Sequence, residues 1–258
     1  MMKQIILITD GCSNVGVSPV IAAAHAKAEG ITVNVIGVID QGELGLLGAE
    51  EIGEIAGAGG GMSRIVKQTE LTQTIQMMTR KTVTQTIQQA VNKELQHILG
   101  DGGGDLERLP PDKRAQIVHV IDELSETTKL QVALLVDTSA SMKPKLAAVR
   151  EAIRDLLLSL KSRAGSSRLA VFHYPGSIPG EEVEMDSGWT TELAHIPKMF
   201  YKINMKGTTP TGPALLRVTQ YVAGRGRDDG ERAGENAAPP ASTLAPYGKD
   251  GMLSDYVV

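Results

Sequence analysis

Oxygen-bearing side chains follow directly after an apolar run in the middle of the chain. The run LQVALLV, residues 130–136, stops at Asp137, and hydroxyl groups follow at Ser139 and Ser141 before a helical pattern begins. Burying a carboxylate costs free energy unless the group is paired or bound to a cation. The Asp-x-Ser-x-Ser spacing also lets one turn direct alternate side chains toward a common point. The segment therefore predicts a cation-binding loop, whereas the simpler interpretation is a cap for the following helix.

Two more segments offer oxygen ligands at comparable positions. An apolar run at residues 5–9 ends at Asp10, and the loop KGTTPTGPAL offers Thr209 just before a helical stretch. In an open parallel sheet, ligands bind outside the carboxyl ends of the strands, where the strand order reverses. Carboxylates and hydroxyls at that edge would form an all-oxygen shell, which suits a hard cation such as Mg²⁺ or Mn²⁺. Each segment alone could also be an ordinary turn.

Strands and helices alternate in both halves of the sequence and would have to position these groups. The expected strands are apolar throughout, which is typical of parallel strands covered on both faces. The fold class that follows is α/β, with a doubly wound, mostly parallel open sheet and helices on both faces. We expect strands at residues 5–9, 32–38, 62–66, 130–136, 168–176 and, at an edge, 181–189, and helices within residues 18–30, 43–61, 145–161 and 211–224.

The stretch between the two α/β halves has a different character. At residues 72–99, apolar side chains recur at four-residue steps among threonines and glutamines, which predicts a long amphipathic helix. Residues 100–105 (GDGGGD) indicate a flexible hinge, and a second helix is expected from Pro111. The apolar positions are Val83, Ile87, Val91 and Leu95 in the first helix and Ile117, Val120, Ile121 and Leu124 in the second.

Composition narrows the class of protein further. The formal net charge of −4 over 258 residues argues against nucleic acid, which rewards clustered Lys and Arg. A single cysteine, Cys12, excludes an internal disulfide and suits a reducing compartment. No segment approaches the ~20 apolar residues of a membrane-spanning helix. We therefore expect a cytoplasmic protein that binds neither nucleic acid nor membrane.

The three oxygen-bearing segments resemble the three pieces of the metal-ion-dependent adhesion site of von Willebrand factor A domains. DTSAS matches the first loop through Asp137, Ser139 and Ser141, GTTPTGPAL matches the second through Thr209, and ITDG matches the third through Asp10. The resemblance implies a Mg²⁺ or Mn²⁺ ion held by these five side chains, some of them through water. It also implies an open coordination position that an Asp or Glu of a partner protein fills.

The order of the pieces differs from that of the family, because the third piece comes first. The simplest explanation is a circular permutation with a helical insertion; the alternative is a swapped homodimer in which the halves of two chains complete each other. A linker that can reach favours closure within one chain. The expected parts are residues 1–70 (C-terminal half of the domain), 71–129 (helical connector), 130–224 (N-terminal half) and 225–258 (disordered tail). The whole sequence also resembles uncharacterised proteins of this type from spore-forming bacilli.

The function that the resemblance implies is binding, not catalysis. A pairing of Ser139 with His173 can be imagined, but no Gly-x-Ser-x-Gly elbow is present, and the glycine clusters lack the nucleotide-binding patterns. Two alternatives stay open. One is an intracellular scaffold in which the helices at residues 72–126 mediate assembly and the metal is incidental. The other is a Mg²⁺-dependent phosphatase-type hydrolase.

Overall fold

Six strands of the described residues form one mixed sheet. The computed structural model describes residues 1–11, 13–39, 46–99, 110–178, 180–192, 200 and 208–225. The strands are β1 (Met2–Thr9), β2 (Ile31–Ile39), β3 (Gly60–Lys67), β4 (Leu130–Asp137), β5 (Ser167–Tyr174) and β6 (Glu184–Thr190). Their spatial order is β3-β2-β1-β4-β5-β6, in which β1 to β5 are parallel and β6 is an antiparallel edge strand. The mostly parallel α/β sheet expected from the sequence is confirmed.

β1 and β4 are neighbours in the sheet although they lie far apart in the sequence. Their register places Ile8 opposite Val136. β2 and β3 continue the sheet on one side of this pair, and β5 and β6 continue it on the other. The strand order therefore reverses between β1 and β4, and the carboxyl ends of these two strands border the position at which open α/β sheets bind ligands.

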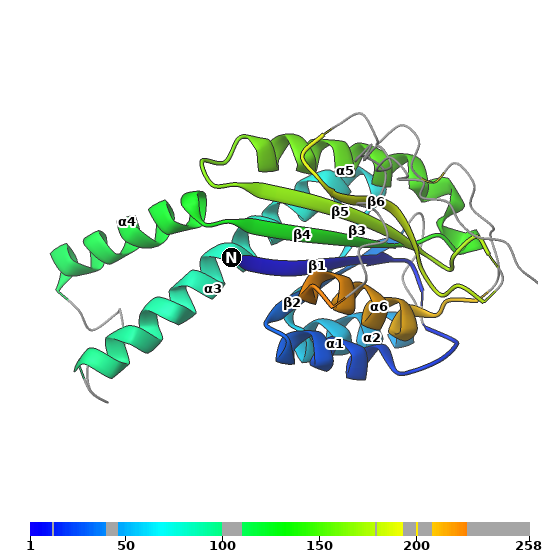
Figure 1. The fold of residues 1–258 in the computed structure, drawn as a ribbon, viewed down its shortest axis with the longest axis horizontal. Coiled ribbons are helices and arrows are strands. Elements are labelled where there is room, and N and C mark those ends of the chain that lie inside the picture. Colours follow the sequence, from blue (N-terminus) through cyan, green and yellow to red (C-terminus); the bar gives the residue numbers. More distant parts are fainter. Residues whose placement is uncertain are drawn as a thin grey trace, which may run out of the picture. The chain divides into compact units, whose positions relative to one another are not determined.

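Helices cover both faces of the sheet, as Figure 1 shows. One face carries α1 (Pro19–Ala28), α2 (Leu46–Ala58) and α6 (Thr211–Ala223), and the other carries α3 (Leu71–Leu99) and α5 (Leu146–Lys161). Neighbouring strand residues alternate between the two cores, so that Ile5 packs with the first set of helices and Ile6 with the second. Because both faces are buried, the central strands β1, β2 and β4 consist mostly of apolar residues, with Gln4, Asn34 and Gln131 as buried polar exceptions.

α5 confirms the helix predicted at residues 145–161. Its apolar stripe is buried against the sheet and consists of Leu146, Val149, Ile153, Leu156, Leu157 and Leu160. A short 3₁₀ helix, η3 (Ala140–Lys145), precedes it and contains Pro144. The chain therefore makes an extra tight turn between the end of β4 and the start of α5.

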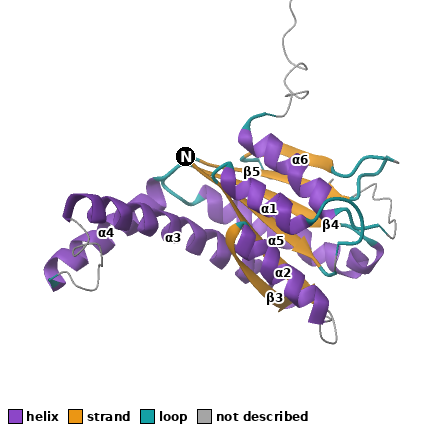
Figure 2. Ribbon diagram, turned by 90° about the horizontal axis from the view of Figure 1, so that it is seen from below, coloured by secondary structure: helices purple, strands orange, loops and turns teal. Residues whose placement is uncertain are grey.

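α3 is longer than the strands that it covers. A second short 3₁₀ helix, η1 (Gln68–Glu70), joins it to β3. The 29 residues of α3 span about 43 Å, whereas an eight-residue strand such as β1 spans about 26 Å. Its first half belongs to the core, where Ile75 and Met78 are fully buried, and Val91 in the second half is only partly buried. The second half continues past the end of the sheet where the parallel strands begin (Figure 2).

α4 (Pro111–Thr127) lies beside the second half of α3, and the two form a projecting arm. Ile121 is buried as the sequence pattern predicts, but Val120 and Leu124, expected on the same apolar face, are exposed. The reason is that α4 packs chiefly on one helix, so only a narrow strip of its surface is covered. None of the helices in the described ranges has an apolar stretch long enough to cross a membrane.

Three predictions concern segments outside the described residues. These are the hinge at residues 100–105, the tail from residue 226 onward, and the surroundings of Cys12. The described residues all belong to one compact unit, residues 1–227.

Candidate metal centre at the carboxyl edge of the sheet

The two predicted carboxylates lie at the same edge of the sheet. Asp137 is the last residue of β4, and Asp10 follows the last residue of β1. Because the two strands are parallel neighbours, the residues after both strands leave the sheet at the same end. A segment near the start of the sequence and a segment in its middle therefore meet within one molecule, at the reversal of the strand order.

Asp137 is a fully buried carboxylate that neutral groups hold. Its Oδ1 accepts a hydrogen bond from the Ser139 backbone N–H at 2.8 Å, and its Oδ2 accepts one from the Thr9 hydroxyl at 2.8 Å. Burial raises the pKa of this carboxyl, and the hydrogen bonds from Ser139 and Thr9 oppose the rise. Within the described ranges, no basic side chain forms an ion pair with Asp137. A buried carboxylate in this condition fits a nearby bound cation.

Asp10 is held by two residues of η3, Ser141 and Lys145. Its Oδ1 accepts a hydrogen bond from the Ser141 hydroxyl at 2.8 Å, across 131 positions of sequence. Its Oδ2 forms an ion pair with the Lys145 ammonium. The hydroxyl oxygens of Ser141 and Ser139 are 3.2 Å apart, so four of the five predicted ligands form a continuous cluster that ends at Asp137.

The residue between Asp137 and Ser139 explains why this loop presents alternate side chains. Thr138 points away from the cluster and donates to the Tyr174 carbonyl of β5, through its backbone N–H at 2.8 Å and its hydroxyl at 3.0 Å. Ser139 precedes η3, but its side chain makes no capping hydrogen bond there. The simpler interpretation of the serines as helix caps is therefore not supported for Ser139, whose hydroxyl faces that of Ser141 instead.

Thr209 is buried and tied to the loop that follows Asp10. Its backbone N–H donates to the Asn14 side-chain oxygen at 2.8 Å, and its carbonyl accepts from the Ser13 hydroxyl at 3.3 Å. Gly212 allows this approach, because a Cβ there would lie 1.8 Å from the Val17 carbonyl oxygen. In the described part of the chain, no hydrogen bond joins the Thr209 hydroxyl to the other four predicted ligands. The structure thus joins the Thr209 loop to the loop after Asp10 through the backbone groups of Thr209.

The chemistry of these groups fits a hard divalent cation. Carboxylate and hydroxyl oxygens are the donors that Mg²⁺ and Mn²⁺ prefer. The described residues contain no group of three or more His, Cys, Asp or Glu side chains placed to hold a metal ion. Hydroxyls and water would therefore have to supply the remaining ligands beside Asp10 and Asp137.

Sequence reasoning missed three residues that shape this site. Thr9 donates to Asp137, and Lys145 pairs with Asp10. Tyr174 is fully buried beneath the junction and accepts a hydrogen bond from the Thr211 hydroxyl at 3.3 Å. Burial and the nearby Asp137 charge raise the pKa of Tyr174 well above its ordinary value, which keeps the phenol neutral. Thr9 and Tyr174 are polar residues at the ends of apolar strands, and this feature of the sequence could have identified them.

His173 belongs to a different cluster. Its Nδ1 lies 2.7 Å from Asp186 and its Nε2 lies 3.5 Å from Glu184, both on β6. The Phe200 ring also packs against the imidazole in a T-shaped arrangement. The imidazole is thus engaged with the edge strand, and the hydrogen bonds of Ser139 in the described structure do not include it.

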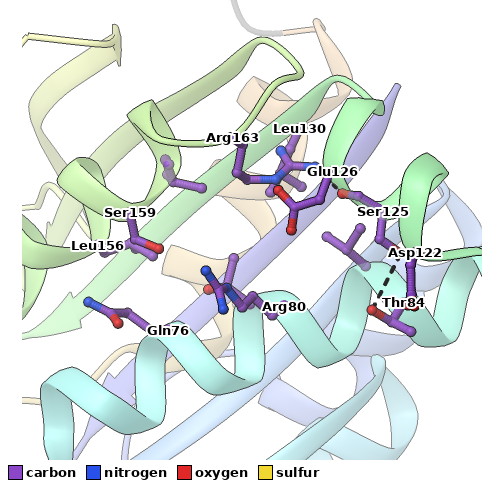
Figure 3. Close-up of a pocket in the computed structure, with 13 residues that line it drawn as sticks. Gln76, Arg80, Thr84, Asp122, Ser125, Glu126, Leu130, Leu156, Ser159 and Arg163 are labelled. Atoms are coloured by element: carbon purple, nitrogen blue, oxygen red, sulfur yellow. Dashed lines mark hydrogen bonds between the residues drawn. The ribbon is translucent and has the colours of Figure 1, made fainter.

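A cavity of about 200 Å³ lies at the opposite end of the sheet, where the helical arm meets α5 (Figure 3). Leu130, the first residue of β4, lines it, whereas Asp137 is the last residue of the same strand. Arg163 donates to the carbonyls of Ser125 and Thr128 and so fastens the end of α4 to α5. Burial lowers the pKa of Arg163, and the neighbouring Glu126 opposes this. The cavity is therefore distinct from the oxygen cluster.

Comparisons with known proteins identify relatives of this chain. No family model matches the sequence. The uncharacterized protein YabS of Bacillus subtilis strain 168 is 48% identical over 218 residues, which cover 84% of this chain and 88% of that protein. The crystal structure of an uncharacterized protein from Alicyclobacillus acidocaldarius subsp. acidocaldarius DSM 446 is similar, with 41% identity and a TM-score of 0.78 over 86% of this chain and 94% of the other. This chain therefore belongs to the family of Bacillus subtilis YabS.

Proposed function

We propose that this protein is a divalent-metal-dependent protein-binding module. The proposed ligands of the Mg²⁺ or Mn²⁺ ion are Asp10, Asp137, Ser139, Ser141 and Thr209, and an acidic residue of a partner protein completes the coordination. The observation that carries the proposal is the fully buried Asp137 carboxylate, which has hydrogen bonds from neutral groups but no ion-pair partner among the described residues.

The local charge supports an acidic partner. Asp10 and Asp137 contribute two negative charges, and Lys145 contributes one positive charge. While the Lys145 ammonium stays beside Asp10, a divalent cation would change the sum of these three charges from −1 to +1, and one carboxylate of a partner would then neutralise them. Neutralisation matters because charges at a water-excluding contact are costly unless each has a partner.

The topology supports a permuted von Willebrand factor A domain as the framework. In this proposal, residues 1–70 and 130–224 are the two halves of the domain, and residues 71–129 connect them. The adjacency of β1 and β4 is what such a permutation requires, since the Asp10 and Asp137 strands must meet. The single cysteine of the composition supports a cytoplasmic location.

The hydrogen bonds of the described cluster include no imidazole, which favours binding over hydrolysis. A hydrolase would need a general base beside the metal-bound water. His173 interacts with Asp186 and Glu184 instead. We therefore keep phosphatase activity as an outcome to be tested, with Mg²⁺ and Mn²⁺ supplied.

The deciding experiment is affinity capture from native lysate by the immobilised chain, with and without Mg²⁺. We expect a set of proteins that the wild type retains with Mg²⁺, that EDTA releases, and that Asp137→Ala does not retain. Glu151→Ala is the matched control, because it removes an exposed carboxylate of α5 that pairs with Arg154 outside the site. Retention of the same proteins by Asp137→Ala, or after EDTA, would show that the metal is not needed for binding.

The exposed apolar side chains of α4 favour a second candidate, a helical scaffold. Val118, Val120 and Leu124 are exposed on the projecting arm. Deletion of the arm from residue 72 onward would remove Ile75 and Met78 from the core, so point substitutions are the cleaner test. Light scattering of Val120→Glu/Leu124→Glu tests the scaffold: a fall in mass relative to the wild type supports assembly through α4, and an unchanged mass counts against it.

A further inference from the structure

The geometry points to Lys145 as a built-in cation that holds the Asp10 carboxylate and lowers the affinity of the site for divalent metal ions. This inference rests on the proposed function, since it concerns the same site. It adds a regulatory feature that the ligand motif does not contain. In it, a divalent ion gains full use of Asp10 only when the Lys145 ammonium moves away.

The first observation is the burial of the ion pair. The side chains of Lys145 and Asp10 are 8% and 4% exposed, and the ammonium contacts Asp10 Oδ2. The same ammonium lies 3.4 Å from the Ser141 carbonyl oxygen, so it sits within the loop that carries two proposed ligands. A surface lysine would be screened by water, but charges buried this closely act strongly on one another.

The second observation is that the two carboxylates have different kinds of partner. Asp10 already has a cationic partner, whereas Asp137 is held by the Ser139 N–H and the Thr9 hydroxyl. An arriving divalent ion therefore meets one carboxylate without an ion pair and one that Lys145 occupies. It must either displace the ammonium or tolerate a like charge beside it, and both lower its affinity.

The third observation concerns the position of Lys145 in the chain. It is the last residue of η3, and α5 begins at the next residue, so its backbone is fixed at a junction. Its four-carbon stem is flexible, which allows the ammonium to move without a backbone change. Lysine can thus act as a removable cation at this position.

The test is a titration of the 258-residue chain with Mn²⁺, in which isothermal calorimetry measures the Kd. Lys145→Met removes the ammonium and keeps most of the stem, and Lys145→Gln keeps an N–H donor for Asp10 in case the first variant folds poorly. Lys143→Met is the matched control, because it removes the same charge from an exposed position in the same 3₁₀ helix. We expect both Lys145 variants to bind Mn²⁺ at least tenfold more tightly than the wild type, and Lys143→Met to stay within twofold.

Thermal unfolding with and without Mn²⁺ separates this role from a purely structural one. A structural lysine would lower the Tm of both Lys145 variants equally in the two conditions and leave the Kd for Mn²⁺ unchanged. The inference instead requires a lower Tm without Mn²⁺ and a larger rise on adding it than in the wild type.

The outcomes for this inference and for the proposed function are distinguishable. If the wild type and the Lys145 variants bind Mn²⁺ equally and Asp137→Ala does not, the inference is wrong and the proposed metal site stands. If only the Lys145 variants bind Mn²⁺, Lys145 suppresses metal binding as inferred, but the proposed metal-dependent binding by the wild type is wrong. If no folded variant binds Mn²⁺, both proposals are wrong.

Discussion

Asp137 is the residue at which folding and the proposed function conflict. Its burial raises the pKa of the carboxyl, so the native state binds this proton more tightly than the unfolded state. Stability therefore falls as the pH rises from the ordinary aspartate range to the raised native pKa, and it stays lower above that value. Above its raised pKa the ionised carboxylate thus destabilises the metal-free protein, which is the cost of holding a ligand inside the fold.

Asp137→Asn should relieve this cost. The amide oxygen can still accept from the Ser139 N–H, and the Thr9 hydroxyl can turn its proton to the Gly11 carbonyl 3.2 Å away. We therefore expect urea unfolding at pH 7 without metal to show a higher free energy of unfolding for Asp137→Asn than for the wild type.

Mn²⁺ should make the wild type more stable than Asp137→Asn and so reverse their order of stability. With Mn²⁺ at a hundred times its Kd, the wild type should gain about 2.7 kcal/mol and Asp137→Asn almost nothing. A variant that is less stable than the wild type without Mn²⁺, or that gains as much from it, would contradict the assignment of Asp137 as a buried ligand.

Among single residues, sequence reasoning found those whose chemistry is local. Asp137, Ser139 and Ser141 share one loop, and Asp10 follows a recognisable strand, so their positions predict that they meet at one edge of the sheet. Their role as metal ligands stays a prediction. Lys145 could not be found in this way, because its partner lies 135 positions away and the pattern placed it at the start of an ordinary helix. Lys145 is instead the last residue of the 3₁₀ helix η3, which the sequence pattern did not predict.

At the scale of elements, the loop before α6 depends on one close approach. Gly212 packs so tightly against the loop before α1 that any Cβ would overlap the Val17 carbonyl. We expect Gly212→Ala to push the two loops apart, to destabilise the protein by about 1–3 kcal/mol, and to weaken Mn²⁺ binding through Thr209. Urea unfolding and calorimetry measure the two effects.

Gly53 of α2 offers the matched control for this substitution. It is exposed within a helix, and a Cβ there would meet no atom within 4 Å. Gly53→Ala should therefore stabilise the protein by roughly 0.5–1 kcal/mol and leave Mn²⁺ binding unchanged. If both alanine variants behaved alike, the close packing of α6 on the Asp10 loop would not matter to the site.

The elements themselves were largely predictable, because each carries a local signal. Apolar runs marked the strands, and a four-residue period marked α3. Along α3, Val83 and Ile87 are buried as the sequence pattern predicts, but the pattern did not mark Leu71, Ile75 and Met78, which are fully buried. The sequence gives no measure of where the sheet beneath a helix ends, and that boundary decides which turns are covered.

At the scale of the whole molecule, the helical arm explains how the two halves can close within one chain. α3 runs back along the sheet from the end of β3, and α4 ends three residues before β4 begins. The chain is thus returned to the amino end of the sheet, where a parallel strand must start. The hydrogen bond from Ser141 to Asp10 then joins the halves at the far end.

This closure predicts that the site needs no second chain. In a swapped dimer, each site would combine Asp10 of one chain with Asp137 of its partner. Unfolding and refolding an Asp10→Asn chain together with an Asp137→Asn chain would then produce mixed dimers with one intact site. If the halves close within one molecule, every chain in the mixture has a defective site, and calorimetry should detect no tight Mn²⁺ binding. Recovery of wild-type affinity in the mixture, but in neither variant alone, would establish the swapped form, since no other arrangement brings the two native carboxylates together.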